Sequence, residues 1–170
     1  MGKVNIVTAT TCKGPAKQEA AGKWLIEYVT EDGIETKDGF LYRQCTTGNE
    51  LTLQLLTNAV YLIGKSKEEF DTVECRIDSD VIASAFMNKW IDKWMENEWK
   101  TAKGNDVANS ELWKQLYSIM NATSKRFIVT NYRSRYTDWM IFEAQRHLDV
   151  IKAKRDLHER FENKEEEKNV

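Results

Sequence analysis

The sequence has three cysteines, one proline and no long apolar run, and each scarcity excludes a class of protein. Cys12, Cys45 and Cys75 lie far apart, without a CxxC motif or a nearby histidine cluster, so neither a disulfide framework nor a zinc site is predicted. The first residues lead directly into residues 4–7, a stretch too short and too polar for a signal peptide or a membrane span. We therefore expect a cytoplasmic protein with free thiols and no membrane contact.

An excess of charge of one sign is also missing, since 25 Lys and Arg residues stand against 27 Asp and Glu residues. This balance argues against a broadly basic nucleic-acid-binding surface, although a local basic patch remains compatible with it. What is present is enough apolar material for a core, because 41% of the chain is hydrophobic and six residues are tryptophan. A length of 170 residues indicates one domain with at most an appendage.

Strands are predicted for the first part of the chain. Runs of β-branched and aromatic residues predict strands over Val4–Thr8, Trp24–Thr30 and Ile34–Cys45, with a hairpin turn at residues 31–33. A β-bulge would fit at Asp38-Gly39 in the third strand. The segment Gly14–Gly22, which holds the only proline, predicts a loop between the first two strands.

Helical periodicity begins near Asn49, which is the expected N-cap of a helix that ends at Gly64. Ser79 is expected to cap a short helix after a strand. The remaining predicted strands cover residues 73–77 and 127–129, and the remaining predicted helices cover residues 89–99, 110–120 and 137 to at least 151. The element order β-β-β-α-β-α-α-α-β-α requires an α/β fold with a mixed five-stranded sheet and helices on both faces.

The sequence also divides into a domain and a tail. Residues 1–148 contain every predicted strand, whereas residues 149–170 carry six Lys and Arg against seven Asp and Glu with few apolar positions. We expect the tail to be a charged, solvated helical extension that frays near residues 165–167. A second interpretation is a partner-binding helix that uses Val150, Leu157 and Phe161.

Five stretches of this chain are similar, in order, to the type 1 ribonuclease H (RNase HI-like) family. Residues 90–103 and 109–113 resemble the substrate-handling protrusion of the bacterial enzymes and the helix after it. Thr46–Asn49 resembles the family's Thr-Thr-Asn-Asn segment, Ile77–Ser79 its Thr-Asp-Ser, and Val7–Cys12 the stretch that holds Thr-Asp-Gly-Ser-Cys. The resemblance covers residues 3–148 and implies an RNase H-like fold.

The family would cleave the RNA strand of an RNA/DNA hybrid with two metal ions held by four carboxylates. By the resemblance, those four positions are Ala9, Thr52, Asp78 and Ile141 here, so only Asp78 keeps a carboxylate. A shift of three residues in the alignment would place Asp138 at the last position instead. Asp78 is thus the only candidate metal ligand of the four, and a vestigial residue or a helix cap is the interpretation we favour for it.

Neighbouring residues offer little replacement. Glu50 lies two residues from Thr52, which places it on another face of the predicted helix. Asp80 shares a face with Asp78 only if the strand continues that far. Asn131 falls near the position of the family's mobile histidine. No cofactor is expected for such a site, whereas an active enzyme would require Mg²⁺ or Mn²⁺.

Binding residues survive better than catalytic ones in this comparison. The resemblance places Thr47 and Asn109 where the family holds a DNA phosphate. Trp90 and Trp94 would stack or pack against the deoxyribose backbone, with core packing as the alternative. The candidate nucleic-acid-binding residues are Thr47, Asn49, Asn109, Trp90, Trp94 and Lys100. A separate basic group, Lys125, Arg126, Arg133 and Arg135, surrounds the last strand and could meet phosphate, an acidic partner or only solvent.

Three functions follow from this inventory. The favoured one is an RNase H-like module that binds an RNA/DNA hybrid or duplex, with a degraded and inactive ribonuclease site. The second is a scaffold that reuses the fold to bind a protein partner. The third is a metal-dependent hybrid ribonuclease with rearranged carboxylates.

Overall fold

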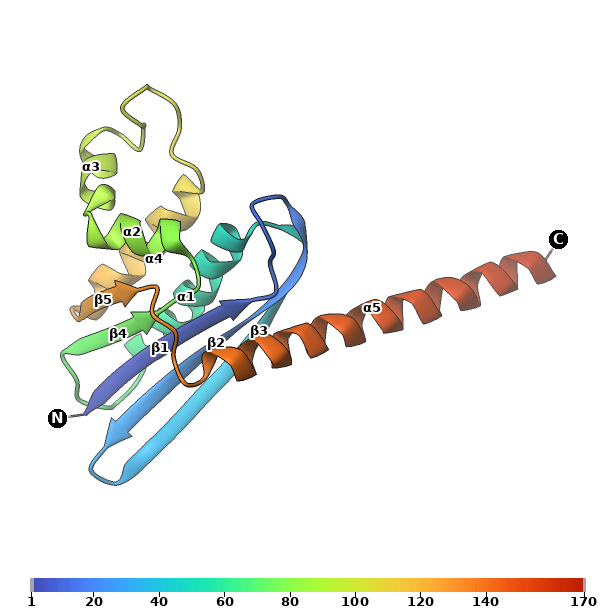
Figure 1. Cartoon of the computed structure of the whole chain (residues 1–170), viewed down its shortest axis with the longest axis horizontal. Helices are drawn as coiled ribbons and strands as arrows, with labels where there is room; N and C mark the ends of the chain where they lie inside the picture. Colours follow the sequence, from blue (N-terminus) through green and yellow to red (C-terminus); the bar gives the residue numbers. More distant parts are fainter. Residues whose placement is uncertain (1, 170) are drawn as a thin grey trace.

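A five-stranded mixed sheet forms the centre of the protein, described by a computed structural model for residues 2–169 (Figure 1). The strands are β1 (Lys3–Thr10), β2 (Gln18–Thr30), β3 (Gly33–Thr46), β4 (Thr72–Arg76) and β5 (Arg126–Thr130). The helices are α1 (Gly48–Gly64), α2 (Asp80–Met87), α3 (Trp90–Glu96), α4 (Ser110–Thr123) and α5 (Thr137–Lys168). The sheet order is β3-β2-β1-β4-β5, antiparallel through β1, β2 and β3 and parallel through β1, β4 and β5. The predicted fold class and element order are confirmed.

The central strand β1 contributes side chains to two separate cores, because its side chains alternate between the faces of the sheet. Val4 and Ile6 enter the main cluster, which α1 and α4 cover. Val7 and Ala9 point to the opposite face and pack against Met140 of α5. Helices therefore cover both faces, as the sequence predicted, and a position on β1 is committed to one face or the other.

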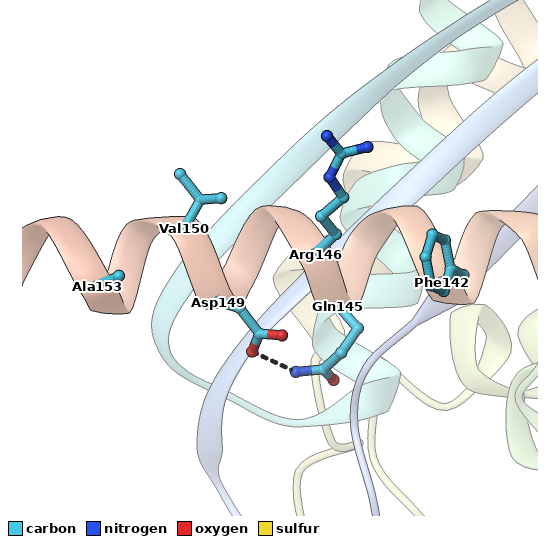
Figure 2. Close-up of a pocket in the computed structure, with 6 residues that line it drawn as sticks. All are labelled: Phe142, Gln145, Arg146, Asp149, Val150 and Ala153. Carbon is cyan, nitrogen blue, oxygen red and sulfur yellow. Dashed lines mark hydrogen bonds between the residues drawn. The ribbon is translucent and has the colours of Figure 1, made fainter.

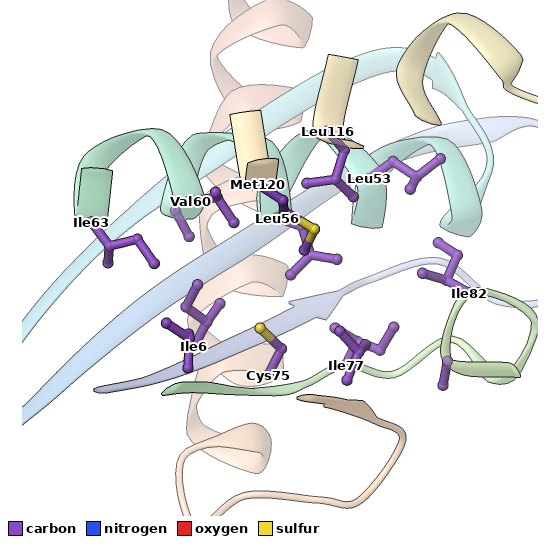
Figure 3. Packing of buried hydrophobic residues seen from close by; sticks show 14 of the residues in the cluster. Ile6, Leu53, Leu56, Val60, Ile63, Cys75, Ile77, Ile82, Leu116 and Met120 are labelled. Carbon is purple, nitrogen blue, oxygen red and sulfur yellow. The ribbon is translucent and has the colours of Figure 1, made fainter. Parts of the chain in front are cut away.

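The larger core lies between the sheet and the α1–α4 layer (Figure 3). Leu53 and Leu56 of α1 and Leu116 of α4 are almost inaccessible to solvent, and Ile6 and Cys75 meet them from the sheet. Each such leucine contributes about 1.5–3 kcal/mol by leaving water. Burial raises the pKa of the Cys75 thiol to about 12, so this cysteine remains a neutral, apolar packing residue.

Two local predictions about the hairpin of β2 and β3 are wrong. Strand β2 begins at Gln18, inside the segment Gly14–Gly22 that was expected to be a loop. The pairing of β3 is regular at Gly39, and the irregularity in this hairpin lies instead between Gln18 and Ala20. Gly39 has a packing function, because a Cβ atom there would lie 2.6 Å from the Trp24 indole. A glycine in a strand thus marked a close approach rather than a bulge.

The N-cap of α1 is Thr47, not Asn49. The Thr47 hydroxyl accepts a hydrogen bond from the backbone N–H of Glu50, whose carboxylate accepts in return from the Thr47 N–H, forming a capping box. Because the cap lies two residues earlier, Asn49 occupies the first turn of the helix and its side chain is free for another contact. The expected cap Ser79 is confirmed, since its hydroxyl accepts from the N–H of Ile82.

Helix α5 is one uninterrupted helix that extends well beyond the sheet (Figure 1). Met140, Ala144 and Leu148 hold its first half against β1 and β2. The helix continues to Lys168, past residues 165–167 where fraying was expected. Within residues 2–169 no helix has the length and apolarity needed to cross a membrane.

A charged clamp holds α5 where it leaves the sheet. Both terminal nitrogens of Arg155 donate to the Glu19 carboxylate, over 2.6 and 3.1 Å, and the Tyr42 hydroxyl donates to the same group. The hydrogen bonds from Arg155, and then that from Tyr42, lower the pKa of Glu19 from 4.5 to about 2. A carboxylate with a lowered pKa stabilises the folded state above its unfolded pKa and loses this contribution as the pH falls.

We expect Glu19→Gln to lower the unfolding temperature by a few degrees at neutral pH. The difference from the wild type should be constant above about pH 5 and about half as large at pH 3, because the unfolded carboxyl then binds protons. Thermal unfolding followed by circular dichroism at several pH values measures this. The Glu31→Gln variant removes an exposed carboxylate outside the clamp and serves as the control, and a pH-independent loss in Glu19→Gln would contradict the clamp.

Candidate active site and nucleic-acid interface

Asp78 lies just beyond the end of β4, beside the end of the parallel strand β1. Its Oδ2 accepts a hydrogen bond of 2.9 Å from the backbone N–H of Thr10. The surrounding protein desolvates the carboxylate and raises the pKa of Asp78, while the Thr10 hydrogen bond opposes that effect. The side chain keeps contact with solvent, so it is accessible from outside.

A hollow of about 330 Å³ opens in front of Asp78. Thr52 of α1 and Thr10 of β1 form part of its wall. Asp80, the first residue of α2, also lines it and accepts a hydrogen bond of 2.8 Å from the Asn131 amide. The structure therefore brings together Thr52 and Asp78. It also places the Asp80 carboxylate at the hollow, although the strand ends before Asp80 and a helix begins there.

Ala9 and Ile141 lie elsewhere, in an apolar cluster between β1 and α5. Ala9 is fully buried with Val7, Leu25 and Met140, and Ile141 packs against this cluster. Because β1 alternates, Thr10 faces the hollow while Ala9 faces α5. Two of the four family positions thus face the hollow, and two contribute to an apolar contact.

Asp138, the alternative to Ile141, is not part of this hollow. It lies in the first turn of α5, where its exposed carboxylate forms an ion pair with Arg133. Glu50 is occupied by the capping box of α1. Within residues 2–169, no group of three or more His, Cys, Asp or Glu side chains could hold a metal ion. A two-metal site requires several converging carboxylates, and the residues present do not fit one.

A second pocket of about 150 Å³ adjoins the first, since Asn49 and Val81 line both. It gathers four of the six candidate binding residues, namely Asn49, Asn109, Trp90 and Trp94. Asn49 is oriented by the Ser79 hydroxyl, which donates to its Oδ1 over 2.7 Å. This oxygen is therefore an acceptor in use, and the amide nitrogen is the group left to donate to a ligand.

Tryptophans build the wall of this second pocket. The Trp94 ring lies edge-on to Trp113 with centroids 5.4 Å apart, and it lies 6.2 Å from both Trp90 and Trp99. Trp90 and Trp94 are half-buried, so each both packs against the core and presents an edge to solvent. The stacking and core interpretations of these two residues are therefore compatible.

Asn109 adopts the left-handed conformation, with φ of 60° and ψ of 28°, immediately before α4. Asparagine tolerates this region better than most residues, which accounts for its place at the bend. No side-chain cap bond engages its amide. Asn109 thus presents a neutral donor at the start of a helix, beside Trp113 in the same pocket.

Thr47 and Lys100 do not line this pocket. Thr47 caps α1, and the Lys100 ammonium forms an ion pair with Asp106. Three members of the basic group around β5 are also engaged within the protein: Lys125 donates to the Phe70 carbonyl, Arg133 binds Asp138, and Arg135 binds Glu27. From the sequence alone these cations look available to a ligand, but three of the four have partners within the folded protein.

Glu27 explains why Arg135 is engaged. This buried carboxylate on β2 accepts hydrogen bonds from Tyr136, Asn5 and Arg135. Burial raises the pKa of Glu27, but these three donors together outweigh it and the net pKa is lowered. The site fixes the loop before α5 to the sheet, and it gives Arg135 a structural function. Sequence reasoning missed it, because Glu27 and Arg135 are far apart in the chain.

Comparison with known proteins agrees with this fold. No family model matches the chain. It is 32% identical over 129 residues to a Ribonuclease H of Clostridium botulinum (strain Hall), covering 75% of this chain and 82% of that protein. A Ribonuclease H of Acetivibrio thermocellus is 30% identical over 128 residues, covering 75% and 81%.

Solved structures show the same fold. LC9-RNase H1, described as a type 1 RNase H with the type 2 active-site motif, matches with a TM-score of 0.69 at 20% identity, covering 88% of this chain and 74% of that one. LC11-RNase H1, solved in complex with an RNA/DNA hybrid, matches with a TM-score of 0.55 at 18% identity, covering 84% and 96%. With sequence identity of 30–32% to curated relatives over about four fifths of their length, the chain belongs to the ribonuclease H family.

Proposed function

We propose that this protein binds RNA/DNA hybrids through the surface formed by its two adjoining pockets and does not cleave them. The observation that carries this proposal is that the candidate binding residues are retained, whereas most of the family's catalytic carboxylates are not. Four candidate binding residues line one pocket, whereas the four family carboxylate positions supply only Asp78. A family fold and a relative solved with an RNA/DNA hybrid support hybrid as the ligand.

The chemistry of the pocket suits a nucleic-acid backbone. Asn49 and Asn109 offer neutral amide donors, which position phosphates without reading sequence. Trp90 and Trp94 offer ring edges and faces against which sugars and bases pack. Because no Lys or Arg is among the residues that line the two pockets, we expect moderate affinity with a shallow salt dependence, corresponding to about one or two displaced phosphate counterions.

Cleavage would require a metal-bound water, and the pocket does not provide the ligands for it. Ala9 and Ile141 offer no oxygen, Thr52 offers a neutral hydroxyl, and the nearby Asp80 is hydrogen-bonded to Asn131. Mg²⁺ would need several oxygen ligands in near-octahedral geometry, and one free carboxylate does not supply them. Asp78 is then a residue that links β4 to the β1 end through Thr10.

A fluorescein-labelled RNA/DNA hybrid tests both parts of this function. Fluorescence anisotropy at low salt should show binding, and Asn109→Gly should weaken it about tenfold, because one hydrogen bond to a charged group is lost. Glycine suits the left-handed backbone at this position, so the change removes the side chain without adding strain. Asn121→Ala, at the other end of α4, is the matched control and should bind as the wild type does.

The same hybrid incubated with Mg²⁺ or Mn²⁺ at high protein concentration should stay intact. Cleavage that Asp78→Asn abolishes would instead establish a ribonuclease with rearranged carboxylates, in which Asp80 is the first substitute to examine. Absence of hybrid binding at low salt would leave the protein-binding scaffold as the function of the fold. Binding that ignores Asn109→Gly would place the interface away from the tryptophan pocket.

A further inference from the structure

The outward face of α5 carries a line of exposed apolar side chains. Helical geometry places residues 142, 146, 150, 153, 157 and 161 within about 100° of arc, on the side opposite to Ala144 and Leu148. Phe142 is 65% exposed, Leu157 53% and Phe161 65%. A shallow groove of about 430 Å³ follows the first part of this line and is lined by Phe142, Gln145, Arg146, Asp149, Val150 and Ala153 (Figure 2). We call the line of residues 142, 146, 150, 153, 157 and 161 the outward stripe.

Two of the six positions of this stripe, Leu157 and Phe161, lie on a part of α5 that has no support from the domain. The Glu19 clamp at Arg155 is the last contact that α5 makes with the sheet in the described chain, and every residue from 156 to 169 is exposed. A solitary helix of about a dozen residues is only marginally stable in water. Large apolar side chains on such a segment gain stability only when another surface covers them.

The charges along α5 are segregated in a way that suggests what covers it. Residues 146–155 hold four Lys and Arg against the single acidic residue Asp149, and three of these cations remain outside the Glu19 clamp of Arg155. Residues 156–167 hold six Asp and Glu against Arg160 and Lys164. The helix therefore has a basic half next to the domain and an acidic half at its end. A second copy laid antiparallel brings each basic half onto an acidic half.

We infer that the outward stripe is a homodimer interface in which two α5 helices pair antiparallel. With the crossing point between residues 155 and 156, Val150 of one copy lies opposite Phe161 of the other, and Ala153 lies next to Leu157. The groove beside Val150 then receives the aromatic ring of Phe161. Arg146, the one cation within the stripe, lies opposite Glu165.

The placement of the two domains permits this pairing. In an antiparallel pair the domains lie at opposite ends, and each acidic half runs along the outward side of the other helix. That side is open, because the sheet contacts Met140, Ala144 and Leu148 on the other side. A parallel pair would instead bring two basic halves together and two acidic halves together, which is unfavourable.

Analytical ultracentrifugation of the full chain tests the inference through its mass. We expect a reversible dimer with twice the 19.8 kDa mass of the chain. Leu157→Glu should raise the dissociation constant roughly 100-fold, because two leucines leave the interface and two charges enter it. Asn163→Glu adds the same charge about 240° around the helix and should leave the dimer intact. Circular dichroism confirms that both variants keep their helix content.

The orientation is tested separately by electron paramagnetic resonance with a nitroxide at Lys168→Cys, in a Cys12→Ser and Cys45→Ser background. An antiparallel pair places the two labels about 40 Å apart, whereas a parallel pair brings them within about 20 Å. A monomer at the highest soluble concentration, a dimer that Leu157→Glu does not weaken, or a short label distance would each overturn the inference. Hybrid binding is not used in these measurements, so failure of the proposed function leaves them unaffected.

Discussion

Introducing Ala9→Asp, Thr52→Glu and Ile141→Asp together should make the stability of this protein dependent on divalent metal. Ala9 is fully buried in an apolar cluster, and Thr52 is also nearly inaccessible. Without metal, two new carboxylates in the apolar cluster under α5 and one in the hollow beside Asp78 lose hydration, so we expect a loss of about 4 kcal/mol or more in the free energy of unfolding. Mn²⁺ or Mg²⁺ at about 100 times its dissociation constant should return about 2.7 kcal/mol.

Chemical denaturation with and without metal measures both effects. The matched control carries Ala9→Asn, Thr52→Gln and Ile141→Asn, which have almost the same volumes and no charge. It should be destabilised by the buried polar groups but should not respond to metal. If the carboxylate variant also ignores metal, then the positions facing α5 and those facing the hollow no longer converge, and the site has changed in backbone geometry as well as in sequence.

Trp113→Ala should cost about 3–5 kcal/mol, because it removes the largest buried side chain next to the tryptophan pocket. Trp113 is 3% exposed and contacts both Phe86 and Trp94 with ring centroids about 5.5 Å apart. The loss should abolish hybrid binding as well, since Asn109 is held at the start of the same helix. Urea unfolding followed by circular dichroism gives the change in stability.

Trp139→Ala is the appropriate comparison for Trp113→Ala. Trp139 is 46% exposed on α5, and its ring lies under the Lys23 ammonium, so its removal should cost about 1 kcal/mol. Equal losses in the two variants would contradict the assignment of Trp113 to the core. They would also weaken the view that the pocket wall is a rigid extension of that core.

The order of strands and helices could be predicted because each element carries its own local pattern. The run of β-branched residues in β1 and the helical spacing in α1 are read from neighbouring residues, and the structure confirms both elements. Gly39 could not be interpreted correctly, because the reason for it is the Trp24 indole on the adjacent strand. The N-cap was misplaced by two residues because Thr47 and Asn49 are both good capping residues, and only the Glu50 contact distinguishes them.

The sequence could predict which residues belong to the candidate site, but it could not predict how they are arranged in space. A linear comparison identifies Ala9 and Thr52 as altered positions, yet it does not show that Ala9 faces α5 on one side of the sheet while Thr52 of α1 lies on the other. Asp80 could not be placed without knowing that a helix begins there and still leaves its side chain at the hollow. Likewise, the cations Arg133 and Arg135 look available in sequence because their partners, Asp138 and Glu27, are revealed only by folding.

The continuity of α5 has a mechanical consequence. A single helix joins Met140, beneath the central strand, to Lys168 at the far end, and no glycine or proline interrupts it. When its outer part is covered and held helical, such a rod bends only slightly and has no hinge at which that part could swing independently. A sideways load applied near Phe161 is transmitted as torque through the Glu19 clamp to Ala144 and Met140. The arm therefore acts as a lever on the contact between α5 and the strands β1 and β2.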